Sequence, residues 1–163
     1  MSAAKSKYIP QPPDRLDKLV DGDMVGESDP PIGLGRTGAR AAVVQALYES
    51  DSAGHPATAA VRRLAIEREL TDDDIDFASR LVRECEDRRI VLDSHIAKLA
   101  TQYPSEQMPL VERNVLRVAL AELEMEDAAP QNVVANEAVE LARLFGSDTS
   151  PKFVNGVLGA LLT

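Results

Sequence analysis

Residues 133–162 read VVANEAVELARLFGSDTSPKFVNGVLGALL, and this stretch decides the fold. Apolar residues recur there at every third or fourth position up to Phe145 and again after Ser150, which is the period of an amphipathic α-helix. Gly146 stands where many helices end on a glycine, and Ser150 with Pro151 is a favourable pair for capping and starting the next helix. The stretch therefore predicts two helices joined by a short loop.

The helical period continues through the chain from residue 36 onward, and no strand-like alternation of apolar and polar residues interrupts it. One helix is predicted to start at Thr71, whose hydroxyl can cap it, and to run unbroken past Leu99 until Pro104 ends it. The other predicted helices begin near Arg40, Pro56, Pro109, Val133 and Ser150. We therefore expect an all-α protein, folded as a single compact bundle of about six to seven helices.

Residues 1–35 have a different composition, with five of the ten prolines, four of the nine glycines and no apolar period. Such a segment cannot bury enough apolar surface to offset the entropy lost on ordering. We expect a disordered Pro/Gly-rich tail over residues 1–35 and one folded domain over residues 36–163.

The chain carries 27 acidic and 18 basic residues, a formal net charge of −9. This field repels nucleic acids and anionic membranes, so a nucleic-acid site would have to be a local basic patch with salt-sensitive binding. No apolar run reaches the ~18 residues of a membrane span and the N-terminus has no secretory signal, so we expect a cytoplasmic protein without a membrane partner. Cys85, the single cysteine, falls at an apolar helical position and is expected in the core.

Motifs that carry catalysis are absent from the sequence. It has no phosphate-binding loop, no dinucleotide fingerprint and no GxSxG nucleophile turn. One cysteine and two separated histidines do not give the spacing of a zinc site. We therefore expect a non-enzymatic binding protein with no catalytic residue, no metal and no cofactor.

Three strings stand out in the folded part: GRTGARAAVVQALY (residues 35–48), PLVERNVLRVALAEL (109–123) and VVANEAVELARLFGSDTSPKFVNGVL (133–158). Together, and in this order, they resemble the NusB transcription antitermination factor family over about residues 36–162. The resemblance implies an all-helical bacterial protein that binds boxA-type single-stranded RNA of the rRNA leader jointly with the ribosomal protein NusE. Joined to RNA polymerase, this complex suppresses termination; a homodimer is also compatible with the family.

The resemblance further implies RNA-binding roles at the start of the first helix. Arg36 and Arg40 match an arginine-rich run that meets RNA phosphates in the family. Thr37 and Gly38 stand where the family often has further arginines, which lowers the expected affinity because each phosphate contact releases roughly one counterion. The alternative for the two arginines is a solvated helix start.

Three more residues are assigned to RNA by the resemblance. Lys152 and Phe153 match the segment at the start of the last helix, where free N–H groups favour phosphate and an aromatic ring can stack on a base. Phe153 fits a core position equally well. Arg117 is expected near the same surface, with a surface ion pair to Glu112 or Glu124 as its alternative. Thr149 and Pro151 depart from the family's pattern just before Lys152.

A NusE-binding surface is implied at Tyr48, Glu106 and Glu112, because an acidic patch attracts a basic ribosomal protein. A second hypothesis also follows from the sequence: a NusB-like protein-interaction module with reduced or lost RNA binding. Its basis is the shortened arginine run together with the acidic sequence pI of about 4.7.

Overall fold

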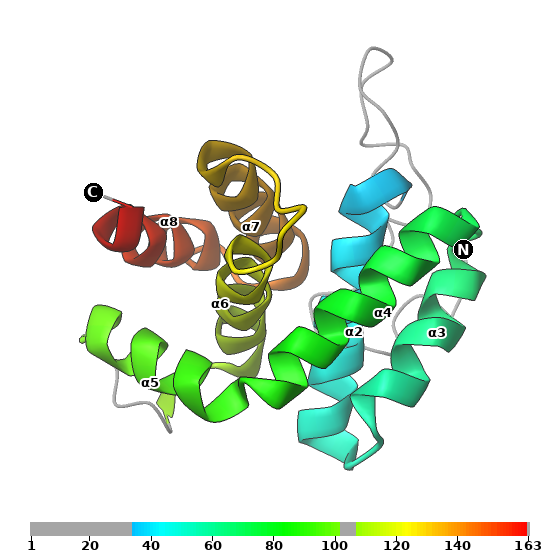
Figure 1. Cartoon of the computed structure of the whole chain (residues 1–163). Coiled ribbons are helices and arrows are strands. Elements are labelled where there is room, and N and C mark those ends of the chain that lie inside the picture. The colour runs from blue at the N-terminus through cyan, green and yellow to red at the C-terminus, as the bar shows by residue number, and fades with distance from the viewer. Residues whose placement is uncertain (1–33, 102–106, 163) are drawn as a thin grey trace. The chain divides into compact units, whose positions relative to one another are not determined.

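The computed structural model describes residues 34–101 and 107–162. Within these ranges the chain forms seven α-helices and no strand, which confirms the predicted all-α class (Figure 1). The helices are α2 (Gly35–Ala53), α3 (Ala57–Glu67), α4 (Asp72–Asp87), α5 (Arg89–Leu99), α6 (Leu110–Leu123), α7 (Gln131–Phe145) and α8 (Ser150–Leu162). The tail predicted over residues 1–35 lies almost entirely outside the described residues.

The described residues divide into two compact units, and the division falls inside α4. Unit 1 is the part up to Val82, and unit 2 begins at Arg83. The predicted boundary between a tail and one folded domain at residue 36 stays a prediction.

Helix α2 is the most deeply buried element of unit 1. Every residue from Gly38 to Leu47 is buried, and the helix packs against α3. It begins at Gly35, five residues before the predicted start at Arg40, so Arg40 lies within the second turn instead of at a solvated helix start. The helix ends at Ala53, and the following Gly54 has a left-handed backbone (φ 78°) whose N–H donates to Ser50 O.

The start of α4 confirms the predicted cap. The backbone N–H of Asp74 donates to Thr71 Oγ1 over 3.2 Å, and the Thr71 hydroxyl donates to Asp74 Oδ2 over 3.1 Å. Acidic residues occupy the first turn of α4, where the helix dipole favours negative charge.

The long helix predicted from Thr71 past Leu99 is wrong, because the chain leaves the α-helical conformation at Arg88 (φ −108°, ψ 20°). The apolar pattern continues across this break, since the buried residues Cys85 and Leu92 are seven positions apart, as in one continuous helix. Between them lie four charged residues and then Ile90, which is 86% exposed. No buried side chain therefore holds the chain in a helix at this point.

Helix α6 is the centre of unit 2. It contacts α5, α7 and α8, and its residues from Val111 to Glu122 are buried except Arg113. A helix that is buried on all sides occupies the middle of a bundle. Beside it, Cys85 is 1% exposed, as predicted, with Sγ 3.9 Å from the carbonyl oxygen of Arg117, and burial raises the pKa of its thiol.

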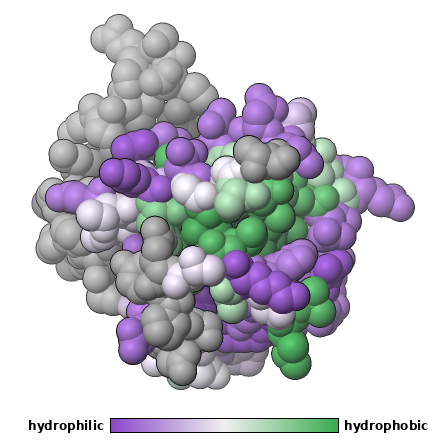
Figure 2. All heavy atoms as spheres, turned by 90° about the vertical axis from the view of Figure 1, so that its left-hand side faces the viewer, coloured by the Kyte–Doolittle hydropathy of each residue, from purple (hydrophilic) through white to green (hydrophobic). Residues whose placement is uncertain are grey.

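Part of the apolar surface stays exposed. Figure 2 shows one face on which hydrophobic residues gather in an area surrounded by hydrophilic residues. Within the described residues, the most exposed large apolar side chains of unit 2 are Ile90 and Val91, at 86% and 52%. No helix in the described part of the chain is both long and apolar enough to cross a membrane.

The inward face of α7 gives a first testable prediction. Leu141 is 3% exposed, so Leu141→Ala should lower the free energy of unfolding by about 2–5 kcal/mol through lost burial and a residual cavity. The matched control is Glu140→Ala, because Glu140 is exposed and makes only a surface pair with Arg143; its expected cost is under about 0.5 kcal/mol. Urea denaturation of both variants measures the difference, and equal costs would contradict the assigned face.

Candidate nucleic-acid interface

The joint between α7 and α8 is built on Gly146. Gly146 follows the end of α7, as predicted; its backbone is extended (φ −97°) and its N–H donates to Ala142 O over 2.8 Å. A Cβ at this position would overlap Ser150 Oγ, and it would lie 2.6 Å from Ser150 Cβ and 2.7 Å from Ala142 O. Glycine is therefore required by the close approach of Ser150 and not by its backbone angles.

Ser150 connects this joint to α6. Its hydroxyl accepts the N–H of Ser147 over 2.9 Å and donates to Glu112 Oε2 over 2.6 Å. At the start of α8, Thr149 O accepts the backbone N–H of Phe153 over 3.1 Å. With Ser150 fully buried and Glu112 only 7% exposed, the loop is fastened to the centre of unit 2.

Lys152 and Phe153 follow directly from this joint. Lys152 is exposed in the first turn of α8, and Phe153 is half-buried. Half-burial leaves part of the Phe153 ring accessible, so both of its predicted roles remain compatible with its position. The joint thus presents one cation and part of one aromatic ring beside a helix N-terminus, a combination suited to phosphate and base contacts.

Arg117 lies in the interior of unit 2, where it is 2% exposed. Its Nε and Nη2 donate to the two carboxylate oxygens of Asp93 over 2.7 and 2.9 Å, and its Nη1 donates to Asn114 Oδ1 over 2.8 Å. This bidentate pair ties α5 to α6. The ion pair is buried on the arginine side, unlike the surface pair considered from the sequence, and a phosphate could reach Arg117 only if the pair opened.

In unit 1, Arg36 and Arg40 lie near the ring of Phe77 from α4. The Cζ atom of Arg36 is 3.9 Å from the ring centroid and that of Arg40 is 5.7 Å from it. Arg36 is half-buried, whereas Arg40 is 5% exposed. Phe77 could not be recognised from the sequence, because it belongs to no motif and is one apolar residue in the face of a helix.

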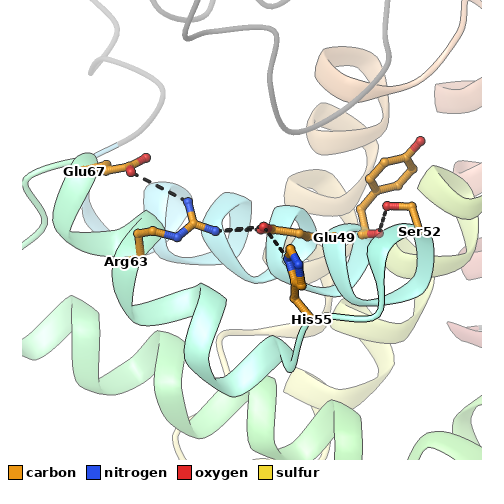
Figure 3. A network of polar contacts seen from close by, with 6 residues as sticks. Glu49, Ser52, His55, Arg63 and Glu67 are labelled. Carbon is orange, nitrogen blue, oxygen red and sulfur yellow. Dashed lines mark hydrogen bonds and ion pairs between the residues drawn. The ribbon is translucent and has the colours of Figure 1, made fainter.

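Tyr48 is half-buried near the end of α2, and burial raises the pKa of its hydroxyl. The Ser52 hydroxyl donates to its carbonyl oxygen over 2.8 Å. The next residue, Glu49, accepts two hydrogen bonds from Arg63 of α3 at 2.8 and 3.0 Å and lies 3.3 Å from His55 (Figure 3). This network joins α2 to α3 and fixes the segment that carries Tyr48.

The two acidic residues predicted with Tyr48 have different outcomes. Glu106 lies outside the described residues. Glu112 belongs to unit 2, and its carboxylate is buried against Ser150, so it supports the α7–α8 joint. Among the residues that the structure describes, no three His, Cys, Asp or Glu side chains gather as a metal site requires.

Comparison with known proteins gives a consistent result. A model of the NusB family matches residues 37–163. The transcription antitermination protein NusB of Dehalococcoides mccartyi (strain CBDB1) is 42% identical over 126 residues, covering 77% of this chain and 88% of that protein. The protein of the same name from Herpetosiphon aurantiacus is 42% identical over 134 residues, covering 80% and 92%.

Solved structures agree with the sequence matches. NusB from T. maritima is similar with a TM-score of 0.72 at 28% identity, covering 78% of this chain and 89% of that one. A chain in the crystal structure of antitermination factors NusB and NusE in complex with dsRNA is similar with a TM-score of 0.67 at 29% identity, covering 76% and 92%.

The two glycines of the α7–α8 region should respond oppositely to the same substitution. Gly146→Ala should lower the melting temperature, because the added Cβ would overlap Ser150. Gly156→Ala should stabilise the protein by up to about 1 kcal/mol, because Gly156 is exposed inside α8 and its Cβ would meet nothing within 4 Å. Calorimetry on both variants tests this; a Gly146→Ala protein as stable as the parent would contradict the close approach.

Proposed function

The chain belongs to the NusB family, and from this membership we propose that it binds boxA-type single-stranded RNA of the rRNA leader jointly with NusE. The family consists of non-enzymatic transcription antitermination factors. In this proposal the protein, RNA and NusE assemble with RNA polymerase and suppress termination of rRNA transcription in the bacterial cytoplasm. The observation that carries the proposal is the similarity to a chain of the solved NusB–NusE–dsRNA complex.

The α7–α8 joint supports the RNA part of the proposal. Lys152 is exposed at the start of α8, and its backbone is held by the contacts of Ser150 with Glu112 and Ser147. A helix N-terminus offers free backbone N–H groups to a phosphate, and a cation in the first turn adds to this attraction. Phe153, half-buried beside it, is the proposed stacking contact for an unpaired base.

The partner surface is proposed around Tyr48. This side chain is partly accessible, and the ion pairs of Glu49 and Arg63 hold the helix end that carries it. The net charge of −9 favours encounter with a basic ribosomal protein. The Glu112 carboxylate, which the sequence assigned to a partner surface, is engaged with Ser150 inside unit 2 and is left out of this proposal.

A second candidate function, a protein-interaction module with reduced RNA binding, is favoured by a different observation. Two of the five residues assigned to RNA from the sequence, Arg40 and Arg117, are only 5% and 2% exposed. Fewer accessible cations mean fewer phosphate contacts and a smaller electrostatic contribution to affinity. Under this alternative the chain binds NusE but not RNA.

Fluorescence anisotropy with a labelled boxA RNA at low salt, with and without NusE, separates the two functions. Parent protein should bind RNA more tightly in the presence of NusE. Lys152→Glu should weaken RNA binding at least about fivefold at 0.1 M salt, because one phosphate contact is lost. The control is Lys98→Glu, an equal charge change at an exposed position of α5.

The outcomes are distinct. An equal loss in Lys98→Glu would indicate an effect of net charge and not of a site at Lys152. Absence of RNA binding under both conditions, with NusE binding retained, would reject the RNA function in favour of the protein-interaction module.

A further inference from the structure

Three guanidinium groups converge on one aromatic ring in unit 1. The ring is that of Phe77 in α4, and the Cζ atoms of Arg36, Arg40 and Arg80 lie 3.9, 5.7 and 5.8 Å from its centroid. Arg36 and Arg40 come from α2, whereas Arg80 comes from α4, one turn after Phe77. The family resemblance implies RNA-binding roles for the two arginines of α2 only, and none for Arg80 or Phe77.

Phe77 is suited to hold these cations in place. Its side chain is fully buried, so the ring is fixed by packing. A guanidinium over an aromatic face is attracted by the ring quadrupole, and Arg36 at 3.9 Å is at stacking distance. Arginine also keeps its charge and its planar set of donors while it stacks, so the N–H groups at its edge can still bind an oxyanion.

The three arginines differ in how far a ligand can reach them. Arg40 is 5% exposed, so a ligand in solution can hardly contact it directly. Arg36 is half-buried, and the side chain of Arg80 is 39% exposed. Arg36 and Arg80 are therefore the more accessible of the three guanidinium groups around Phe77.

Arg80 already has a carboxylate neighbour. Its Nε lies 3.0 Å from Asp76 Oδ2, one turn earlier on α4, and the Asp76 side chain is 66% exposed. Exposed pairs of this kind contribute only about 0.3–0.5 kcal/mol and are screened by salt. A phosphate, with more charge and more acceptor oxygens, can take the place of the carboxylate at small cost.

We propose that Arg36 and Arg80 form a phosphate-binding site for the RNA backbone, in which Phe77 is the positioning residue and the buried Arg40 adds positive charge. The proposal rests on the RNA-binding function proposed above. In this site Arg80 of α4 supplies a cation beside the start of α2, where Thr37 and Gly38 stand in place of further arginines. Asp76 competes with the phosphate for Arg80 and thereby lowers the affinity.

The test measures RNA affinity as a function of salt for Arg80→Gln. Loss of one phosphate contact should weaken boxA RNA binding about fivefold at 0.1 M salt and reduce the slope of log K against log salt by about 0.7. Asp76→Asn should strengthen binding, since it removes the competing carboxylate. Phe77→Leu keeps an apolar core residue without the aromatic ring and should reduce the slope as Arg80→Gln does.

Matched controls separate a site from an effect of net charge. Arg62→Gln removes one charge from an exposed position of α3 in the same unit, and Glu126→Gln removes one acidic charge from an exposed position in unit 2. Both should leave the salt slope unchanged. Circular dichroism and melting curves show which variants are folded, and if Phe77→Leu is not folded, the Arg80 and Asp76 variants carry the test.

The results distinguish the two proposals. If the parent protein binds no RNA with or without NusE, the proposed function fails and this site fails with it. If the parent binds and Arg80→Gln keeps both affinity and slope, the RNA function stands and the site at Arg80 is rejected. An unchanged affinity in Asp76→Asn would contradict competition by Asp76.

Discussion

The contact between Ser150 and the backbone of Gly146 is the constraint on which the candidate interface depends. Because position 146 has no Cβ, the end of α7 and the start of α8 approach closely enough for the Ser150 hydroxyl to reach Ser147 and Glu112. The direction in which α8 leaves the loop follows from this contact. The exposure of Lys152 and the half-burial of Phe153 are therefore consequences of a backbone approach and not of the two side chains themselves.

The same helix, α6, holds a second buried polar contact. Arg117 reaches Asp93 and Asn114, while Glu112, slightly more than one turn earlier, reaches Ser150. Such polar groups lose hydration when they are buried, so the pairs contribute little net free energy to stability. Removing one partner, however, leaves the other buried without a hydrogen bond, which costs considerably more. Their effect is to penalise alternative packings: α5 and the α7–α8 joint have one favourable position each on α6.

Much of the fold could be predicted from the sequence, because helical periodicity and capping are local properties. The helix pair around Gly146, the Thr71 cap and the buried Cys85 follow from such patterns. The break at Arg88 could not be predicted, since the apolar spacing from Cys85 to Leu92 fits one helix as well as two. Gly146 was correctly placed at a helix end, but the reason for glycine is a contact between residues that only the folded backbone brings together.

The candidate site was predicted less well, for two physical reasons. Arg117 was expected at the surface because it is charged. Helix α6 is, however, buried on all sides, and an apolar pattern on one face of a helix does not indicate that the other faces are buried too. Glu112 was assigned to a partner surface although it falls on the apolar stripe of α6, and its position on that stripe was the better signal of burial. Tyr48 and Lys152, by contrast, remain accessible where the sequence placed them.

The ion pairs between arginines and carboxylates show how the acidic net charge is distributed over the structure. Several arginines have a carboxylate partner, as Arg117 has Asp93 and Arg63 has Glu49, so the number of cations is a poor guide to the capacity for RNA. RNA binding depends on how many cationic side chains are accessible to solvent and on how well ordered these side chains are. An arginine stacked on a buried ring loses less conformational entropy on binding than a mobile one. Under the two proposals above, a few accessible cations would let a chain of charge −9 attract a polyanion locally while its remaining surface repels it.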